Sequence, residues 1–148
     1  MPVAAMQSAL QAGCRSHDLL VVDMPRHLDA AARLAAERLD TLLVVVPAEV
    51  RAAAAASRVV ARASMVVNDI RVVVRGPAPS SLRPGTIADS LGLPLVGELR
   101  PERRLDAALD RGDPPGERRR GPLATFAARF LAEFVPVLQA KAGRGTAA

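Results

Sequence analysis

The sequence predicts an α/β domain with a parallel sheet of about four strands flanked by helices. Short apolar runs rich in β-branched residues predict buried strands at residues 19–23, 42–46, 70–74 and 94–99. Helical patterns alternate with these runs, and such alternation is typical of parallel strands joined by right-handed helical crossovers.

The intervals between the apolar runs contain the predicted helices. Apolar spacing predicts helices at residues 4–12, 27–39, 49–63, 87–91, 102–110 and 123–138. An alanine run at 52–56 would let its helix lie close against the sheet. Two segments rich in proline and glycine, 76–84 and 112–122, are predicted to be surface loops. Pro136 should bend or end the last helix.

The length of 148 residues suits one domain, with a core at about residues 17–140 and a flexible tail at 141–148. Cys14 is the single cysteine, which excludes an internal disulfide and fits a reducing cytoplasm. No run approaches the roughly 18 uncharged apolar residues of a membrane span, so we expect neither a signal peptide nor a transmembrane helix.

The charge pattern argues against nucleic-acid binding. The net charge is +5, but the arginines alternate with Asp and Glu, and there is no Tyr or Trp for bases to stack on. His17 and His27 match no zinc spacing, and no serine lies in a Gly-x-Ser-x-Gly elbow. A metal centre of that kind and a serine hydrolase are therefore not expected.

Asp23 is the best candidate for chemistry. It ends the run at 19–23, and open α/β folds bind ligands at the carboxyl edge of the sheet. In phosphate-handling sites an Asp placed there can hold Mg²⁺ or its water shell beside a nucleotide. The alternative from the residues alone is that Asp23 only caps the following turn.

Four segments in order carry a family resemblance: HDLLVVDMPR at 17–26, DTLLVVVPAEVRAAAAASRV at 40–59, IRVVVRG at 70–76, and IADSLGLPLVGELRPERRLDAALDRGDPP at 87–115. Together they resemble the MinD/ParA family of P-loop ATPases, with the closest likeness to its CpaE-like branch. That branch is linked with secretion and pilus gene neighbourhoods or described as septum-site-determining. The resemblance covers most of the chain and implies the C-terminal half of such an ATPase.

The resemblance also implies site residues. Asp23 and Pro25 match the family's acidic switch-like Asp-x-Pro segment, and Arg26 fits the CpaE-like variant of that segment. A later strand of the family commonly ends in Asn-Arg near the nucleotide base, whereas here Arg75 is followed by Gly76. The implied nucleotide-binding residues are Asp23, Pro25, Arg26 and Arg75, with Asp23 also implied for Mg²⁺.

The family's glycine-rich phosphate loop has no counterpart in the sequence. It precedes the Asp strand, but the sixteen residues before His17 contain one Gly and no Lys. The resemblance implies that this loop and its strand, which lies between the Asp strand and the strand at 42–46, are missing. We therefore expect no catalytic residue and no efficient ATPase in the chain alone, and ATP with Mg²⁺ only if another chain supplies the loop.

A missing strand would leave an unsatisfied sheet edge, which favours a protein partner or a homodimer. The expected function is a truncated CpaE-like protein in the cytoplasm, a non-catalytic or partner-completed nucleotide-binding module in secretion, pilus assembly or septum-site placement. One alternative is a protein-interaction module that uses no nucleotide, and another is a complete ATPase whose true start lies upstream of Met1.

The last predicted helix leaves one further question open. Phe126, Phe130 and Phe134 recur every four residues and are expected to pack against the sheet. The alternative is a peripheral contact with a membrane or a partner. The arginines at 118–120 are expected to lie in a solvated loop, offset by nearby acidic residues.

Overall fold

The computed structural model describes the backbone of residues 1–76 and 82–145, and the side chains of residues 1–76 and 82–136. The elements in chain order are α1 (Val3–Ser16), α2 (Ala30–Ala36), β1 (Leu42–Pro47), α3 (Val50–Ala63), β2 (Ile70–Arg75), α4 (Pro84–Leu91), β3 (Leu95–Leu99), α5 (Leu105–Asp110) and α6 (Pro122–Gly145). Residues 77–81 of the predicted loop at 76–84 lie outside the described residues.

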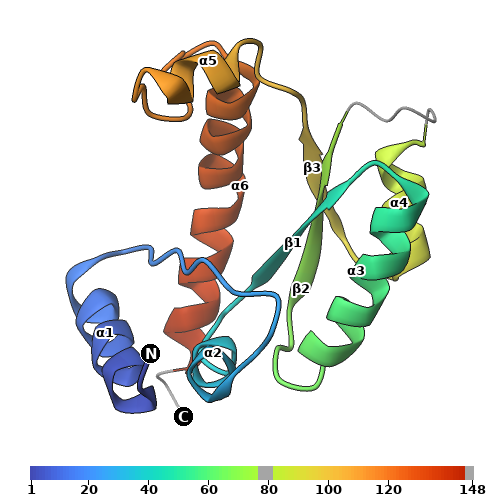
Figure 1. Cartoon of the computed structure of the whole chain (residues 1–148). Coiled ribbons are helices and arrows are strands. Elements are labelled where there is room, and N and C mark those ends of the chain that lie inside the picture. The colour runs from blue at the N-terminus through green and yellow to red at the C-terminus, as the bar shows by residue number, and fades with distance from the viewer. Residues whose placement is uncertain (77–81, 146–148) are drawn as a thin grey trace.

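A three-stranded parallel sheet of order β1-β2-β3 forms the centre of the fold. The helices α3 and α4 lie on one side of it and α6 on the other, as Figure 1 shows. Because each parallel strand must return to the same edge, the connecting helices α3 and α4 run antiparallel to the strands. The predicted class, a parallel sheet flanked by helices, is confirmed.

The main core lies between the sheet and the helices α3 and α4. Its largest buried side chains are Val46, Val72, Val74 and Ile87, all at most 1% exposed. Ala56 of α3 packs into the same cluster, and its small side chain lets the helix approach the strands. The valine runs therefore have one face buried by these two helices.

The helix α6 packs on the opposite face of the sheet, as predicted. The rings of Phe126, Phe130 and Phe134 stack along the helix, and Arg71 of β2 lies 4.8 Å from the centre of the Phe134 ring. A Cβ atom at Gly97 of β3 would meet the end of the Arg129 side chain and lie 3.5 Å from the Phe126 ring, so α6 lies close to this strand.

The end of α6 differs from the prediction. Pro136 lies inside the helix and does not end it, and the helix continues to Gly145. Part of the predicted flexible tail is thus helical, while residues 146–148 of that tail lie outside the described residues. Among the described helices, none is both long enough and apolar enough to cross a membrane.

The predicted strand at residues 19–23 is wrong. This segment belongs to an irregular connection between α1 and α2, and the side chain of Val21 is 81% exposed. A strand forms only where a neighbour accepts and donates its backbone hydrogen bonds. The segment has no such neighbour, since β1 pairs with β2 alone among the described strands.

We predict that adjacent valines of β1 respond very differently to the same substitution. Val46 is 1% exposed and Val45 is 56% exposed. Val46→Ala removes buried methyl groups and should lower the free energy of unfolding by about 2–3 kcal/mol, whereas Val45→Ala should cost less than about 1 kcal/mol. Urea titration measures both, and equal losses would contradict the assigned orientation of β1.

Candidate functional site

The three strands end at one edge of the sheet, where open α/β folds bind ligands. The carbonyl oxygen of Arg75, at the end of β2, accepts a hydrogen bond from the Ala48 N–H at 3.0 Å. The Gly76 N–H donates to the Leu99 carbonyl oxygen at 3.0 Å. These bonds join the carboxyl ends of all three strands, and the Arg75 side chain is exposed there.

A carboxylate that the sequence analysis did not single out lies at this edge. A Cβ atom at Gly76 would lie 2.5 Å from Oε1 of Glu98, so the Glu98 side chain rests against the Gly76 backbone. Its other oxygen, Oε2, lies 3.8 Å from Nε of Arg100. The only sequence signal for Glu98 was a charged residue within an otherwise apolar strand.

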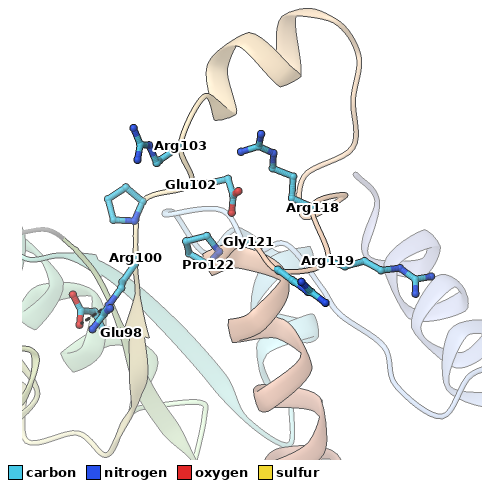
Figure 2. A pocket seen from close by; sticks show the side chains of 10 residues that line it. Glu98, Arg100, Glu102, Arg103, Arg118, Arg119, Gly121 and Pro122 are labelled. Atoms are coloured by element: carbon cyan, nitrogen blue, oxygen red, sulfur yellow. Dashed lines mark ion pairs between the residues drawn. The ribbon is translucent and has the colours of Figure 1, made fainter.

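A hollow of about 1020 Å³ lies beyond the carboxyl end of β3, and Figure 2 shows its lining. Arginines at 100, 103 and 118–120 surround it together with Glu98 and Glu102. Glu102 Oε2 accepts a hydrogen bond from the Leu123 N–H at 3.2 Å, so this carboxylate satisfies a free donor in the first turn of α6. The arginines at 118–120 are exposed, as expected for a solvated loop.

Asp23 lies in the irregular segment between α1 and α2. Its side chain is exposed. Within the described residues it makes no side-chain hydrogen bond or ion pair. The position at the end of a strand, which motivated its assignment, is therefore not realised in the isolated chain.

Met24, Pro25 and Arg26 line a groove of about 990 Å³ that runs along β1. Residues 24–28 and α2 contribute to its lining, and so does α3. Neither Asp23 nor Arg75 belongs to the lining of this groove or of the hollow beside β3. Of the four predicted nucleotide-binding residues, Pro25 and Arg26 thus line the same groove, whereas Asp23 and Arg75 do not. The structure does not gather the four residues into one site.

The described side chains include no group of three or more His, Cys, Asp or Glu that could hold a metal ion. Asp23 would therefore contribute to Mg²⁺ binding only with ligands from elsewhere, such as nucleotide phosphates or water.

Comparison with known sequences gives two relatives. No protein-family model matches the chain. The uncharacterized proteins MT3760 and Rv3660c of Mycobacterium tuberculosis, strains CDC 1551 / Oshkosh and ATCC 25618 / H37Rv, are each 36% identical over 126 residues. The match covers 85% of this chain but 36% of each relative, so the chain spans about a third of the length of these curated relatives.

Comparison with solved structures identifies the fold. The chain is similar to the MinD cell division protein of Aquifex aeolicus, with a TM-score of 0.72 and 23% identity over 90% of this chain and 62% of that one. A ParA family ATPase from Chlorobium tepidum TLS gives 0.77 and 13%, over 90% and 57%. A MinC:MinD cell division protein complex of Aquifex aeolicus gives 0.75 and 23%, over 90% and 60%. The chain has part of the MinD/ParA-type α/β fold.

We predict that Asp23 contributes nothing to the stability of the isolated chain. Because its side chain is exposed and unpaired within the described residues, Asp23→Asn should change the free energy of unfolding by less than about 0.5 kcal/mol. Asp29→Ala is the comparison, since Asp29 Oδ1 accepts the Ala32 N–H at 2.8 Å as the N-cap of α2. That variant should lose about 1 kcal/mol in thermal or urea unfolding. A comparable loss in Asp23→Asn would contradict the exposed position.

Proposed function

We propose that this chain is a member of the MinD/ParA family, of its CpaE-like branch, and corresponds to the C-terminal half of such an ATPase. It acts as a nucleotide-binding module without catalysis of its own, completed by a polypeptide that carries a phosphate loop. The observation that carries this proposal is the MinD/ParA-type fold over 90% of the chain, combined with the Asp23-Met24-Pro25-Arg26 motif.

In the completed module each of the four proposed nucleotide-binding residues, Asp23, Pro25, Arg26 and Arg75, has a role. Asp23 holds Mg²⁺ through its carboxylate, and Pro25 and Arg26 shape the turn beside the phosphates. Arg75 is exposed where β2 ends, and from this edge of the sheet its side chain contacts the nucleotide. A phosphate loop from another chain supplies the backbone N–H groups that bind phosphate. ATP and Mg²⁺ bind only to the completed module.

The proposal extends to the cellular setting. We place the module in the cytoplasm, in secretion, pilus assembly or septum-site placement, with a protein partner or a second copy. One of the similar structures is a MinC:MinD complex, which supports a partner-dependent role. A membrane contact through α6 is the less favoured arrangement, because the phenylalanine face of this helix packs on the sheet.

Calorimetry with Mg²⁺-ATP tests nucleotide binding. The chain is titrated alone and after purification together with the proteins it retains from its own cells. We expect binding to the complex and at least about tenfold weaker binding with Asp23→Asn, because a contact to a charged group contributes about 1.5–3 kcal/mol. Asp18→Asn, an exposed Asp in the same segment, serves as the matched control and should bind like the wild type.

Two results would contradict the nucleotide-binding proposal. One is the absence of Mg²⁺-ATP binding in every complex that the chain forms. The other is binding that Asp23→Asn and Asp18→Asn leave equally strong.

A second function is favoured by a different observation. β1 lacks a neighbour on its outer edge among the described strands, and an open apolar edge is a common means of protein recognition. The chain would then be a protein-interaction module that uses no nucleotide. In that case pull-downs with the wild type and with Asp23→Ala should return the same partners, and nucleotide should change neither set.

A further inference from the structure

The outer edge of β1 presents a free hydrogen-bonding ladder. The Leu42 N–H donates to the Asp69 carbonyl oxygen at 2.9 Å, and the Ala48 N–H donates to the Arg75 carbonyl oxygen at 3.0 Å, both toward β2. In a parallel pair alternate residues bond to the same neighbour. The backbone N–H and C=O groups of Leu43 and Val45 therefore point away from β2, toward the groove.

The side chains of β1 are apolar on both faces of the sheet. Leu42, Val44 and Val46 pack toward α3, which places Leu43 and Val45 on the opposite face. There Val45 is 56% exposed. A strand that is apolar on both faces is typical of the interior of a sheet and unusual at its edge.

The other edge strand differs from β1. β3 contains Gly97 and the charged Glu98, and its pairing with β2 has a register irregularity between Val72 and Val73. Charges and irregular pairing are the features by which natural sheets block edge-to-edge association. The segment 42–46 of β1 has neither, so of the two edges of the described sheet this one is better suited to accept another strand.

The groove beside β1 is long enough for one strand. Its lining includes every residue of β1 from Leu42 to Pro47, so an extended segment laid in it meets the whole outer edge of the strand. Residues 24–28 and α2 also contribute to the lining, so a second copy, whose β1 is attached to its own β2 and α3, would have to fit past them.

The lining of the groove is basic. Arg26 of the segment before α2, Arg33 of α2, and Arg58 and Arg62 of α3 belong to it, and none of its lining residues is acidic. Ala36, Ala63 and Leu42 pack together, which places Arg33 and Arg62 near the amino end of β1. Arg33 pairs with Glu37 at 3.4 Å, and Arg58 and Arg62 make no ion pair within the described residues.

We propose that the groove beside β1 binds one extended apolar strand of a partner protein, flanked by acidic residues at the end that lies beside Arg58 and Arg62. The backbone of the strand pairs with Leu43 and Val45, its apolar side chains lie beside those of β1 on both faces of the sheet, and the acidic flank pairs with the two arginines. This recognition needs neither nucleotide nor Asp23, so it can fail or hold independently of nucleotide binding.

The test uses fluorescence anisotropy with a labelled probe peptide of six apolar residues, Val and Ile, and two Glu at one end, made with the Glu pair at either end. Val45→Pro removes the outward N–H and leaves the ladder to β2 intact, as prolines on edge strands do. Val45→Ala is the matched control, because it shortens the same side chain but keeps the N–H. We expect Val45→Pro to weaken binding roughly tenfold or more, and Val45→Ala to change it less than about threefold.

The acidic flank is tested by charge reversal. The double variant Arg58→Glu, Arg62→Glu should lose binding to the Glu-flanked probe and gain binding to the same peptide flanked by Lys. Two further probes are N-methylated at one or the other alternate set of residues. The probe whose methyl groups replace the N–H groups that face β1 should bind the wild type as weakly as the unmethylated probe binds Val45→Pro, and the other probe should bind more tightly. Circular dichroism of each variant confirms that the fold is kept.

Three results would overturn the proposal. The first is that the wild type and Val45→Pro bind the probe equally well. The second is that the double variant Arg58→Glu, Arg62→Glu keeps the preference of the wild type for the Glu-flanked probe over the Lys-flanked one. The third is a dimer of the free chain in sedimentation that Val45→Pro dissociates, since the occupant would then be a second copy.

Discussion

The hydrogen bonding of β1 explains much of the rest of the structure. β1 is bonded to β2 along its full length, while no strand of the described part of the chain lies beside the outward N–H and C=O groups of Leu43 and Val45. A buried apolar strand needs partners on both sides, because unpaired backbone groups are costly away from water. β1 is thus hydrogen-bonded as a central strand would be on the side of β2, but not on its outer side.

The irregular segment between α1 and α2 follows from the same constraint. Residues 19–22 are as apolar and β-branched as β1, yet Leu20 and Val21 are 38% and 81% exposed. Within the described part of the chain no backbone hydrogen bond joins this segment to a strand, so it has no ladder to join. Asp23 consequently stays in solvent.

Much of the fold could be predicted from the sequence because it depends on local patterns. The strands at 42–46, 70–74 and 94–99 and the helices between them recur in the structure with small shifts of their ends. The run at 19–23 has an equally strong strand pattern, but whether it pairs depends on a neighbour that its own residues do not encode. Pro136 shows a related limit, since α6 continues to Gly145 past a residue that usually interrupts a helix.

The candidate site could be predicted only in part. Asp23, Pro25 and Arg26 stand out because they form a short contiguous motif. Glu98 and Glu102 do not, since their places against Gly76 and beside the first turn of α6 depend on contacts between distant segments. The groove is likewise a product of tertiary structure, in which residues 24–28 and α3 come to face the same strand.

Residue-specific amide hydrogen exchange of the isolated chain tests the central claim, that β1 is bonded on one side only. We expect the amides of Leu42, Val44 and Val46 to be protected by β2, and those of Leu43 and Val45 to exchange at least about a hundredfold faster, because only the first set is hydrogen-bonded. Equal protection of both sets in the monomeric chain would contradict the open edge.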